Sequence, residues 1–149
     1  MLEHVFDPMS MIKEIARVLK PGGIGIFLIP QTSVLHELPR HYYNFTRSWI
    51  LEAMRRGGLE IVELKPLGGV WSLMASHLVY FVFQSLRMKS FSPPECKRNF
   101  GFYLLYPFML LFMMICLPVC LLLSFGDLTE EPNNHLVVVK KDHSYESFR

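Results

Sequence analysis

The segment from His36 to Ile50, HELPRHYYNFTRSWI, concentrates side chains that can do chemistry. It holds two histidines, one glutamate, two arginines and two adjacent tyrosines. An imidazole titrates near neutral pH, so His36 could accept a proton from a substrate hydroxyl or amine. A metal site and a glycosylated loop are two other interpretations of the same residues.

Neither of these two interpretations is favoured. His36 and His41 are one position too far apart for the HExxH pattern, and Pro39 opposes a helix that would present both imidazoles to zinc. Asn44-Phe45-Thr46 satisfies the N-x-[ST] rule, but MLEHVFDPMS at the N-terminus lacks the apolar segment of a signal peptide. The segment is therefore expected to be either a pocket rim or a structural loop.

The elements that would position this segment follow from periodicity and turn residues. Helices are predicted over 7–19 and 46–56, and strands over 24–29, 59–66 and 135–141. The run IGIFLI is nearly continuously apolar, which predicts a strand buried on both faces of a largely parallel sheet. The alternation of helices and strands indicates an α/β fold, in which residues that follow a strand's carboxyl end commonly contact substrate.

Several of these pieces, in this order and spacing, resemble the C-terminal half of a class I S-adenosylmethionine-dependent methyltransferase of the type-11 group. The matching pieces are LEHVFDP (2–8), EIARVLKPGG (14–23), IFLIP (26–30), the opening segment, GGLEIVELKPLGG (57–69) and HLVVVKK (135–141). The resemblance implies a partial Rossmann-like methyltransferase sheet, with the strand at 24–29 between a strand ending near LEH and the closing strand. The implied cofactor is S-adenosylmethionine.

The resemblance also implies roles for individual residues. Glu3 and His4 would face the cofactor at the carboxyl edge of the sheet, unless His4 only satisfies a loop carbonyl. His36 would act as a proton acceptor and Tyr42 would flank the methyl group. Glu37, His41 and Arg47 would contact the substrate, although Arg47 could instead be a surface residue at a helix start. No metal is expected.

One departure from the family pattern limits the expected activity. The family holds its cofactor with a Gly-rich turn after the first strand and an acid on the second strand. The doublets Gly22-Gly23, Gly57-Gly58 and Gly68-Gly69 do not occupy that position. The chain is therefore expected to be a truncated or degenerate form that is inactive alone. The alternative is a non-catalytic, membrane-associated remnant that binds a partner or a lipid.

The insertion between the second and third strands is the most apolar part of the chain. Residues 100–125 carry no charge and are long enough to span the roughly 30 Å hydrocarbon layer; 70–86 are also apolar, and a basic loop separates the two. If both flanking strands belong to one sheet, a single span is excluded. A monotopic arrangement, either a hairpin in one leaflet or helices lying in the interface, is favoured over two spans or a helical lid. Two spans would carry the basic loop away from a cytosolic domain, against the positive-inside tendency. Pro107 and Pro118 should also kink or break the long helix, which suits a shallow insertion.

These observations predict membrane association through 70–125, with the α/β part facing the cytosol. The expected organisation is a partial methyltransferase domain at 1–69, the helical insertion at 70–127, a closing strand at 128–142 and a tail at 143–149. A formal net charge of +2 is too small to indicate a nucleic-acid partner. The hydrophobic content of 51% indicates that part of the chain contacts lipid or another protein. The predicted membrane association makes a small or lipid-like molecule the expected methyl acceptor.

Overall fold

The computed structural model describes residues 1–141, so the predicted tail at 143–149 lies outside the described residues. The chain divides into two compact units. The first, here called the sheet unit, contains 1–33, 42–67 and the residues from Asn133 onward. The second, here called the hairpin unit, contains Val34–His41 and Gly68–Pro132.

The sheet unit begins with a short 3-10 helix, η1 (Leu2–His4), and the helix α1 (Pro8–Val18). Asp7 caps α1 by accepting a hydrogen bond from the backbone N–H of Ser10 at 3.1 Å. Ile12 and Ala16 are buried, as the helical spacing predicts. Leu2–His4 form a 3-10 turn, so residues 1–141 contain no strand near LEH, and the strand implied there stays a prediction.

The second helix of the sheet unit, α2 (Arg47–Arg56), also forms where the sequence predicts it. Thr46 caps it, because its hydroxyl accepts a hydrogen bond from the backbone N–H of Trp49 at 3.3 Å. Ile50, Ala53 and Met54 are buried on the face toward the core. The helix ends at Gly57, whose N–H bonds back to the last turn.

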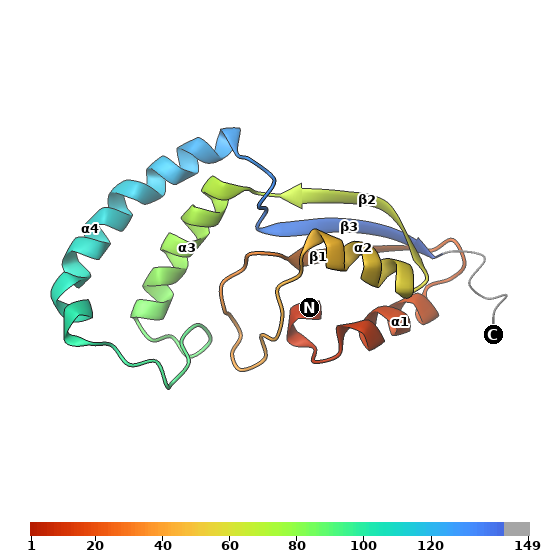
Figure 1. Ribbon diagram of the computed structural model, residues 1–149, viewed down its shortest axis with the longest axis horizontal. Coiled ribbons are helices and arrows are strands. Elements are labelled where there is room, and N and C mark those ends of the chain that lie inside the picture. Colours follow the sequence, from red (N-terminus) through yellow and green to blue (C-terminus); the bar gives the residue numbers. More distant parts are fainter. Residues whose placement is uncertain (142–149) are drawn as a thin grey trace. The chain divides into compact units, whose positions relative to one another are not determined.

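The sheet contains three described strands in the order β1-β3-β2. They are β1 (Ile24–Pro30), β2 (Leu59–Leu67) and β3 (Asn134–Lys141). The last strand in the chain, β3, lies between the other two and pairs antiparallel with both (Figure 1). The three predicted strands therefore lie side by side in one sheet, which confirms the α/β interpretation at the level of a partial sheet.

The prediction that β1 is buried on both faces of a largely parallel sheet is wrong. Both described strand pairs are antiparallel. Ile24, Ile26 and Leu28 are 65%, 71% and 58% exposed, whereas Phe27 and Ile29 are buried in the core. The core that contains these two residues also receives the buried faces of α1 and α2, so both helices cover the same side of the sheet. The other side of β1 is apolar, and no residue among 1–141 buries it.

The hairpin unit consists of α3 (Val70–Ser85), α4 (Phe100–Leu123) and a short 3-10 turn, η2 (Ser124–Gly126). Pro107 and Pro118 lie inside α4, which continues through both and is visibly curved in Figure 1. The prolines thus bend this helix without breaking it. Phe100–Gly126 is long and apolar enough to cross a membrane, and almost none of it is buried.

Candidate functional site

Three of the predicted site residues meet at the N-terminal end of the sheet unit. Glu3 is buried, and its carboxylate accepts a hydrogen bond from the N-terminal ammonium group at 2.6 Å. The Nε2 atom of His4 lies 3.6 Å from the same carboxylate. The backbone N–H of Tyr42 donates to the carbonyl oxygen of Glu3 at 2.8 Å, which places Tyr42 beside η1.

The carboxyl group of Glu3 is held in its charged form. Burial on its own raises the pKa of Glu3. Hydrogen bonds from the terminal ammonium and from the backbone N–H of Glu3, together with the positive charges of the ammonium and His4, outweigh burial and lower this pKa below its ordinary value. Glu3 therefore presents a negative charge at neutral pH.

A pocket of about 360 Å³ opens beside Glu3. Its apolar wall comes from Leu2 and from Ile26 and Leu28 on the edge strand β1. Glu3 and Asn134 supply polar groups to its lining. A buried carboxylate next to an apolar hollow can hold a ligand that carries both a cationic and an apolar part.

The aromatic residues between positions 42 and 49 are mostly packed against other aromatic rings. Tyr42 is exposed, and its ring meets Phe6 edge-on with centroids 5.7 Å apart. The Tyr43 hydroxyl donates to the carbonyl oxygen of Phe6 at 3.0 Å. Phe45 is buried, and its ring lies 4.2 Å from that of Trp49. Phe45 thus serves the core, whereas Tyr42 keeps an exposed ring.

His36, Glu37 and His41 belong to the hairpin unit, whereas Glu3, His4, Tyr42 and Arg47 belong to the sheet unit. This division of the predicted site residues could not be read from their closeness in the sequence. In the hairpin unit, the loop of these three residues is held by a hydrogen bond from the N–H of Leu38 to the carbonyl oxygen of Ser90 at 3.2 Å.

The two histidines of this loop form a pair. Their rings are 4.6 Å apart and perpendicular, and the backbone N–H of His36 donates to Nδ1 of His41 at 3.4 Å. Nδ1 of His36 lies 2.9 Å from the carbonyl oxygen of Val34. A neutral His36 in this arrangement carries its proton on Nδ1, so Nε2 is the nitrogen that can accept a proton.

His135 is a candidate that the sequence did not reveal. It is buried at the start of β3, and its Nε2 lies 2.7 Å from the side-chain oxygen of Gln31. Its Nδ1 is buried and has no hydrogen-bond partner among residues 1–141. Burial, and then the nearby charge of Arg47, lower the pKa of His135, so it is neutral at physiological pH.

A sequence signal for this pair exists, but it depends on the strand register. Gln31 directly follows β1, and His135 pairs with Ile29 on that strand. Only the antiparallel pairing of two distant segments brings these residues to the same end of the sheet. Arg47, the first residue of α2, is exposed beside this end and acts on His135 through its charge.

The Gly68-Gly69 junction does not form a nucleotide-binding turn. Gly68 and Gly69 join β2 to α3, the one strand–Gly-Gly–helix junction among residues 1–141. A side chain at Gly69 would lie 2.0 Å from the carbonyl oxygen of Leu128. The first N–H groups of α3 already bind the carboxylate of Asp127. This junction is therefore filled by the protein's own backbone and by Asp127, which leaves no cradle for a nucleotide.

Comparison with known proteins agrees with the resemblance at one end of the chain. Residues 1–27 match the family model of a methyltransferase domain. No curated protein sequence matches the chain. The matched residues contain Glu3, His4, all of α1 and the first part of β1. Residues 1–27 are therefore similar to part of a methyltransferase domain, and the mixed helix-and-sheet fold is consistent with part of an α/β methyltransferase domain.

Proposed function

We propose that this chain carries the C-terminal half of an S-adenosylmethionine-dependent methyltransferase that works at a membrane on a small or lipid-like acceptor. The observation that carries the proposal is the methyltransferase match over residues 1–27, followed by the ordered β1-β3-β2 sheet. The cofactor supplies an activated methyl group, so the protein needs mainly to bind and orient the acceptor and to remove its proton.

The proposed roles of the chain's own residues follow from their chemistry. Glu3 offers a charged carboxylate to the cationic cofactor, with His4 beside it. His36 accepts the acceptor's proton on Nε2, and Tyr42 offers an exposed ring to the methyl group. The remaining polar residues, Glu37, His41 and Arg47, contact the acceptor.

Residues 1–149 by themselves are proposed to be inactive. Two observations support this part of the proposal. The described residues provide no glycine cradle for the cofactor, since the Gly68-Gly69 junction is filled. β1 is an edge strand whose exposed side chains are Ile24, Ile26 and Leu28, and folded proteins normally cover such edges. A segment paired with β1 would cover this edge.

The acceptor is proposed to be hydrophobic because of the hairpin unit. Phe100–Gly126 is long and apolar enough to cross a bilayer, so the protein is proposed to sit on a membrane with its sheet unit on the cytosolic side. An enzyme held there meets lipids, quinone-like molecules and other membrane-dissolved acceptors at high local concentration.

Titration calorimetry with S-adenosylmethionine tests the proposal of an incomplete cofactor site. The full chain in detergent is expected to give no saturable heat, and S-adenosylhomocysteine serves as a second ligand. Micromolar binding of either ligand would contradict the proposal that residues 1–149 lack a working cofactor site.

A second candidate function is that of a non-catalytic membrane protein. Two observations support it: the Gly68-Gly69 junction is filled by the protein's own backbone, and the surface of α4 is apolar and exposed. The coding sequence upstream of Met1 distinguishes the two candidates. An in-frame Gly-rich turn followed by an acid, with S-adenosylmethionine binding by the extended protein, supports the enzyme. A transcript that starts at Met1 without such a motif supports the non-catalytic protein.

A further inference from the structure

The two helices of the hairpin unit are tied together at both ends. At the base, the N–H groups of Trp71 and Ser72 donate to the two carboxylate oxygens of Asp127, each at 2.8 Å. Near the tip, the hydroxyl oxygens of Ser85 and Tyr106 are 2.8 Å apart. These contacts fix which parts of α3 and α4 must lie next to each other.

The helical segments between these ties differ in length. Ser72 and Ser85 are 13 positions apart, whereas Tyr106 and Asp127 are 21 positions apart. α4 ends at Leu123, and η2 separates it from Asp127, so the helical part of the second segment, Tyr106–Leu123, spans 17 positions. At about 1.5 Å per residue this is roughly 26 Å of helix, against roughly 20 Å for Ser72–Ser85. The longer helical segment does not run straight beside the shorter one, and Figure 1 shows α4 curved around α3.

Pro107 and Pro118 determine the direction of this curvature. They are 11 positions apart, close to three helical turns, so they lie on the same side of α4. Both are exposed, which places them on the side away from α3. A proline lacks the N–H of the helical hydrogen bond and bends the helix away from its own ring. The two bends therefore add, and both turn α4 toward α3.

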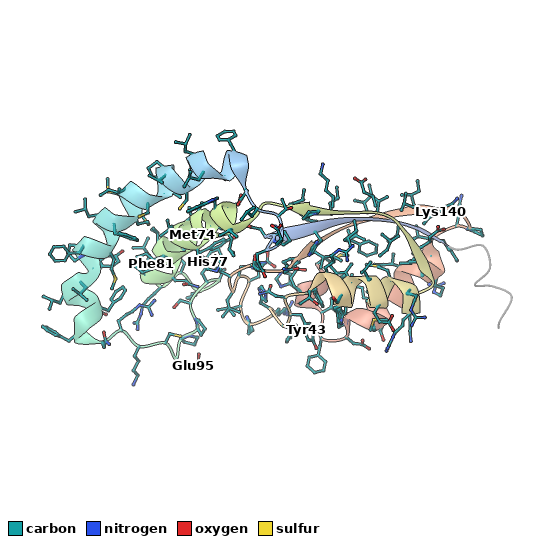
Figure 2. The ribbon with its side chains drawn as sticks, turned by 45° about the horizontal axis from the view of Figure 1, so that its top comes forward. Tyr43, Met74, His77, Phe81, Glu95 and Lys140 are labelled. Atoms are coloured by element: carbon teal, nitrogen blue, oxygen red, sulfur yellow. The ribbon has the colours of Figure 1, made fainter. Side chains whose placement is uncertain are left out.

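The curvature leaves apolar hollows between the helices. Two of them, of about 420 Å³ and 360 Å³, share Leu78 and Phe112 in their lining. Met74, His77 and Phe81, labelled on α3 in Figure 2, also line these two hollows. Hollows of this kind are suited to lipid acyl chains, because almost every surface that lines them is carbon.

The surface of α4 is apolar in every direction. Three consecutive residues, Tyr103, Leu104 and Leu105, are 62%, 60% and 50% exposed. Consecutive helical residues point about 100° apart, so these three directions span about 200° and leave no wide polar face toward the surroundings. The same holds for the exposed run 121–123 near the other end. A helix that lies flat in the interface needs one polar face, which α4 lacks, so α4 must be immersed in the hydrocarbon.

The loop that precedes α4 is basic. It contains one acidic residue, Glu95, and four basic residues: Arg87, Lys89, Lys97 and Arg98. Arg87 donates to the carbonyl oxygen of Cys96 at 3.1 Å, and Arg98 donates to that of Gln84 at 2.6 Å. The loop is thus folded against the helix ends and carries a net positive charge, which anionic lipid headgroups attract.

From this geometry we infer that the hairpin inserts into one leaflet of an anionic membrane. The convex side of α4 faces the bilayer centre, α3 lies closer to the surface, and the base and the basic loop both return to the same headgroup layer. The inference rests on the membrane association proposed above and names its partner, a leaflet that contains anionic lipid. It differs from a two-span hairpin, which would place the loop and the base on opposite sides.

Cysteine labelling distinguishes the two topologies. Cys96 is exposed in the loop, and Gly126 at the base has no atom within 4 Å of an added side chain. One variant keeps Cys96 and carries Cys116→Ala and Cys120→Ala. The other carries Gly126→Cys with all three natural cysteines replaced by alanine. Both are reconstituted into sealed phosphatidylcholine–phosphatidylglycerol vesicles and treated with a membrane-impermeant maleimide.

One-leaflet insertion predicts that both cysteines react to the same extent from the same side. Labelling of the two cysteines from opposite sides would overturn the inference and support two spans. Failure of both variants to float with the vesicles would instead overturn the membrane association itself. A Pro107→Leu/Pro118→Leu double variant, which straightens α4, is expected to move Cys96 to the opposite side from the base. Unchanged Cys96 labelling in this variant would contradict the role of the prolines.

The headgroup contact has its own test. Lys89→Gln with Lys97→Gln removes two positive charges, and each is worth roughly fivefold in affinity for an anionic surface, or about twenty-five-fold together. The loss is expected on vesicles that contain phosphatidylglycerol and not on pure phosphatidylcholine. An equal loss on both vesicle types would contradict the proposed contact with anionic headgroups.

Discussion

The backbone N–H of Trp71 donates to a carboxylate oxygen of Asp127 at 2.8 Å, although the two residues are 56 positions apart. The other carboxylate oxygen accepts the N–H of Ser72. The N-cap residue of α3 is Gly69, which has no side chain to offer these groups. Asp127 therefore caps α3 from the far end of the hairpin, and its negative charge lies at the positive end of the helix dipole. This contact closes the hairpin at its base.

Replacement of Asp127 by alanine should open this base. The first N–H groups of α3 would lose their acceptor, and the end of the hairpin would no longer be joined to its beginning. Hydrogen exchange in detergent micelles is expected to show several-fold faster exchange at Trp71 and Ser72. Glu130→Ala removes an exposed acid nearby and should leave these amides unchanged. Equal exchange in the Asp127→Ala variant and the natural protein would show that other contacts close the base.

The same contact should depend on pH in a defined direction. Burial raises the pKa of Asp127, but hydrogen bonds from the Ser72 side chain and from the N–H groups of Ser72, Trp71 and Leu128 outweigh burial and lower it. A carboxyl with a lowered folded-state pKa stabilises the fold fully above its unfolded-state pKa and loses this contribution as the pH falls. Protection of the Trp71 amide should therefore fall on acidification, and Asp127→Asn should abolish that fall. A pH-dependent loss that persists in Asp127→Asn would assign it to another group.

Substitutions at Gly69 and Gly126 test how tightly the backbone packs at the base of the hairpin. A side chain at Gly69 would come within 2.0 Å of the carbonyl oxygen of Leu128, and the backbone there cannot move aside easily. Gly69→Ala is expected to destabilise the protein by roughly 1–3 kcal/mol or more, as other overpacked sites do. Gly126→Ala meets no atom within 4 Å and should be neutral. Thermal unfolding of both variants checks this, and equal midpoints would contradict the tight base.

The local elements could be predicted from the sequence because their signals are local. Asp7 and Pro8 mark the start of α1, Thr46 marks the start of α2, and Gly57 marks its end. The spacing of Ile50, Ala53 and Met54 correctly predicts the buried face of α2. The pairing of β1 with β3 agrees with the resemblance to a family, which supplies long-range information that periodicity lacks.

The remaining features depend on contacts between distant residues. An apolar run such as IGIFLI shows that both faces of β1 are hydrophobic, but not whether other elements cover both. In the described residues one face is exposed to solvent. The pair of His135 with Gln31 requires the register of β3 on β1. The neighbours His36 and Tyr42 in one short segment belong to different compact units, because the chain crosses between the units at His41 and Tyr42. None of these relationships has a signature within a short window of sequence.

The core of the sheet unit offers a direct test of the fold. Met54 is fully buried on α2, whereas Leu51 on the same helix is exposed. Met54→Ala is expected to lower the free energy of unfolding by about 2–5 kcal/mol, the usual cost of deleting a buried side chain of this size. Leu51→Ala should change it by less than about 0.5 kcal/mol. Urea denaturation of both variants provides the measurement, and similar losses would contradict the assignment of α2's inner face.

The buried imidazole of His135 should make the sheet unit less stable as the pH falls. Burial, followed by the charge of Arg47, lowers the pKa of His135 from the ordinary 6.5. Between the two pKa values, His135 is therefore protonated in the unfolded chain and neutral in the folded chain. The stability contributed by neutral His135 is complete above the unfolded-state pKa and decreases below it, until the folded-state pKa is reached.

His135→Gln keeps a donor toward Gln31 but cannot titrate, so its urea denaturation should show a smaller loss of stability between about pH 7.5 and pH 5. Arg47→Gln removes one cause of the lowered pKa and should reduce the loss only in part, because burial, the larger cause, remains. Identical pH profiles for the natural protein and His135→Gln would show that protonation of His135 does not oppose folding.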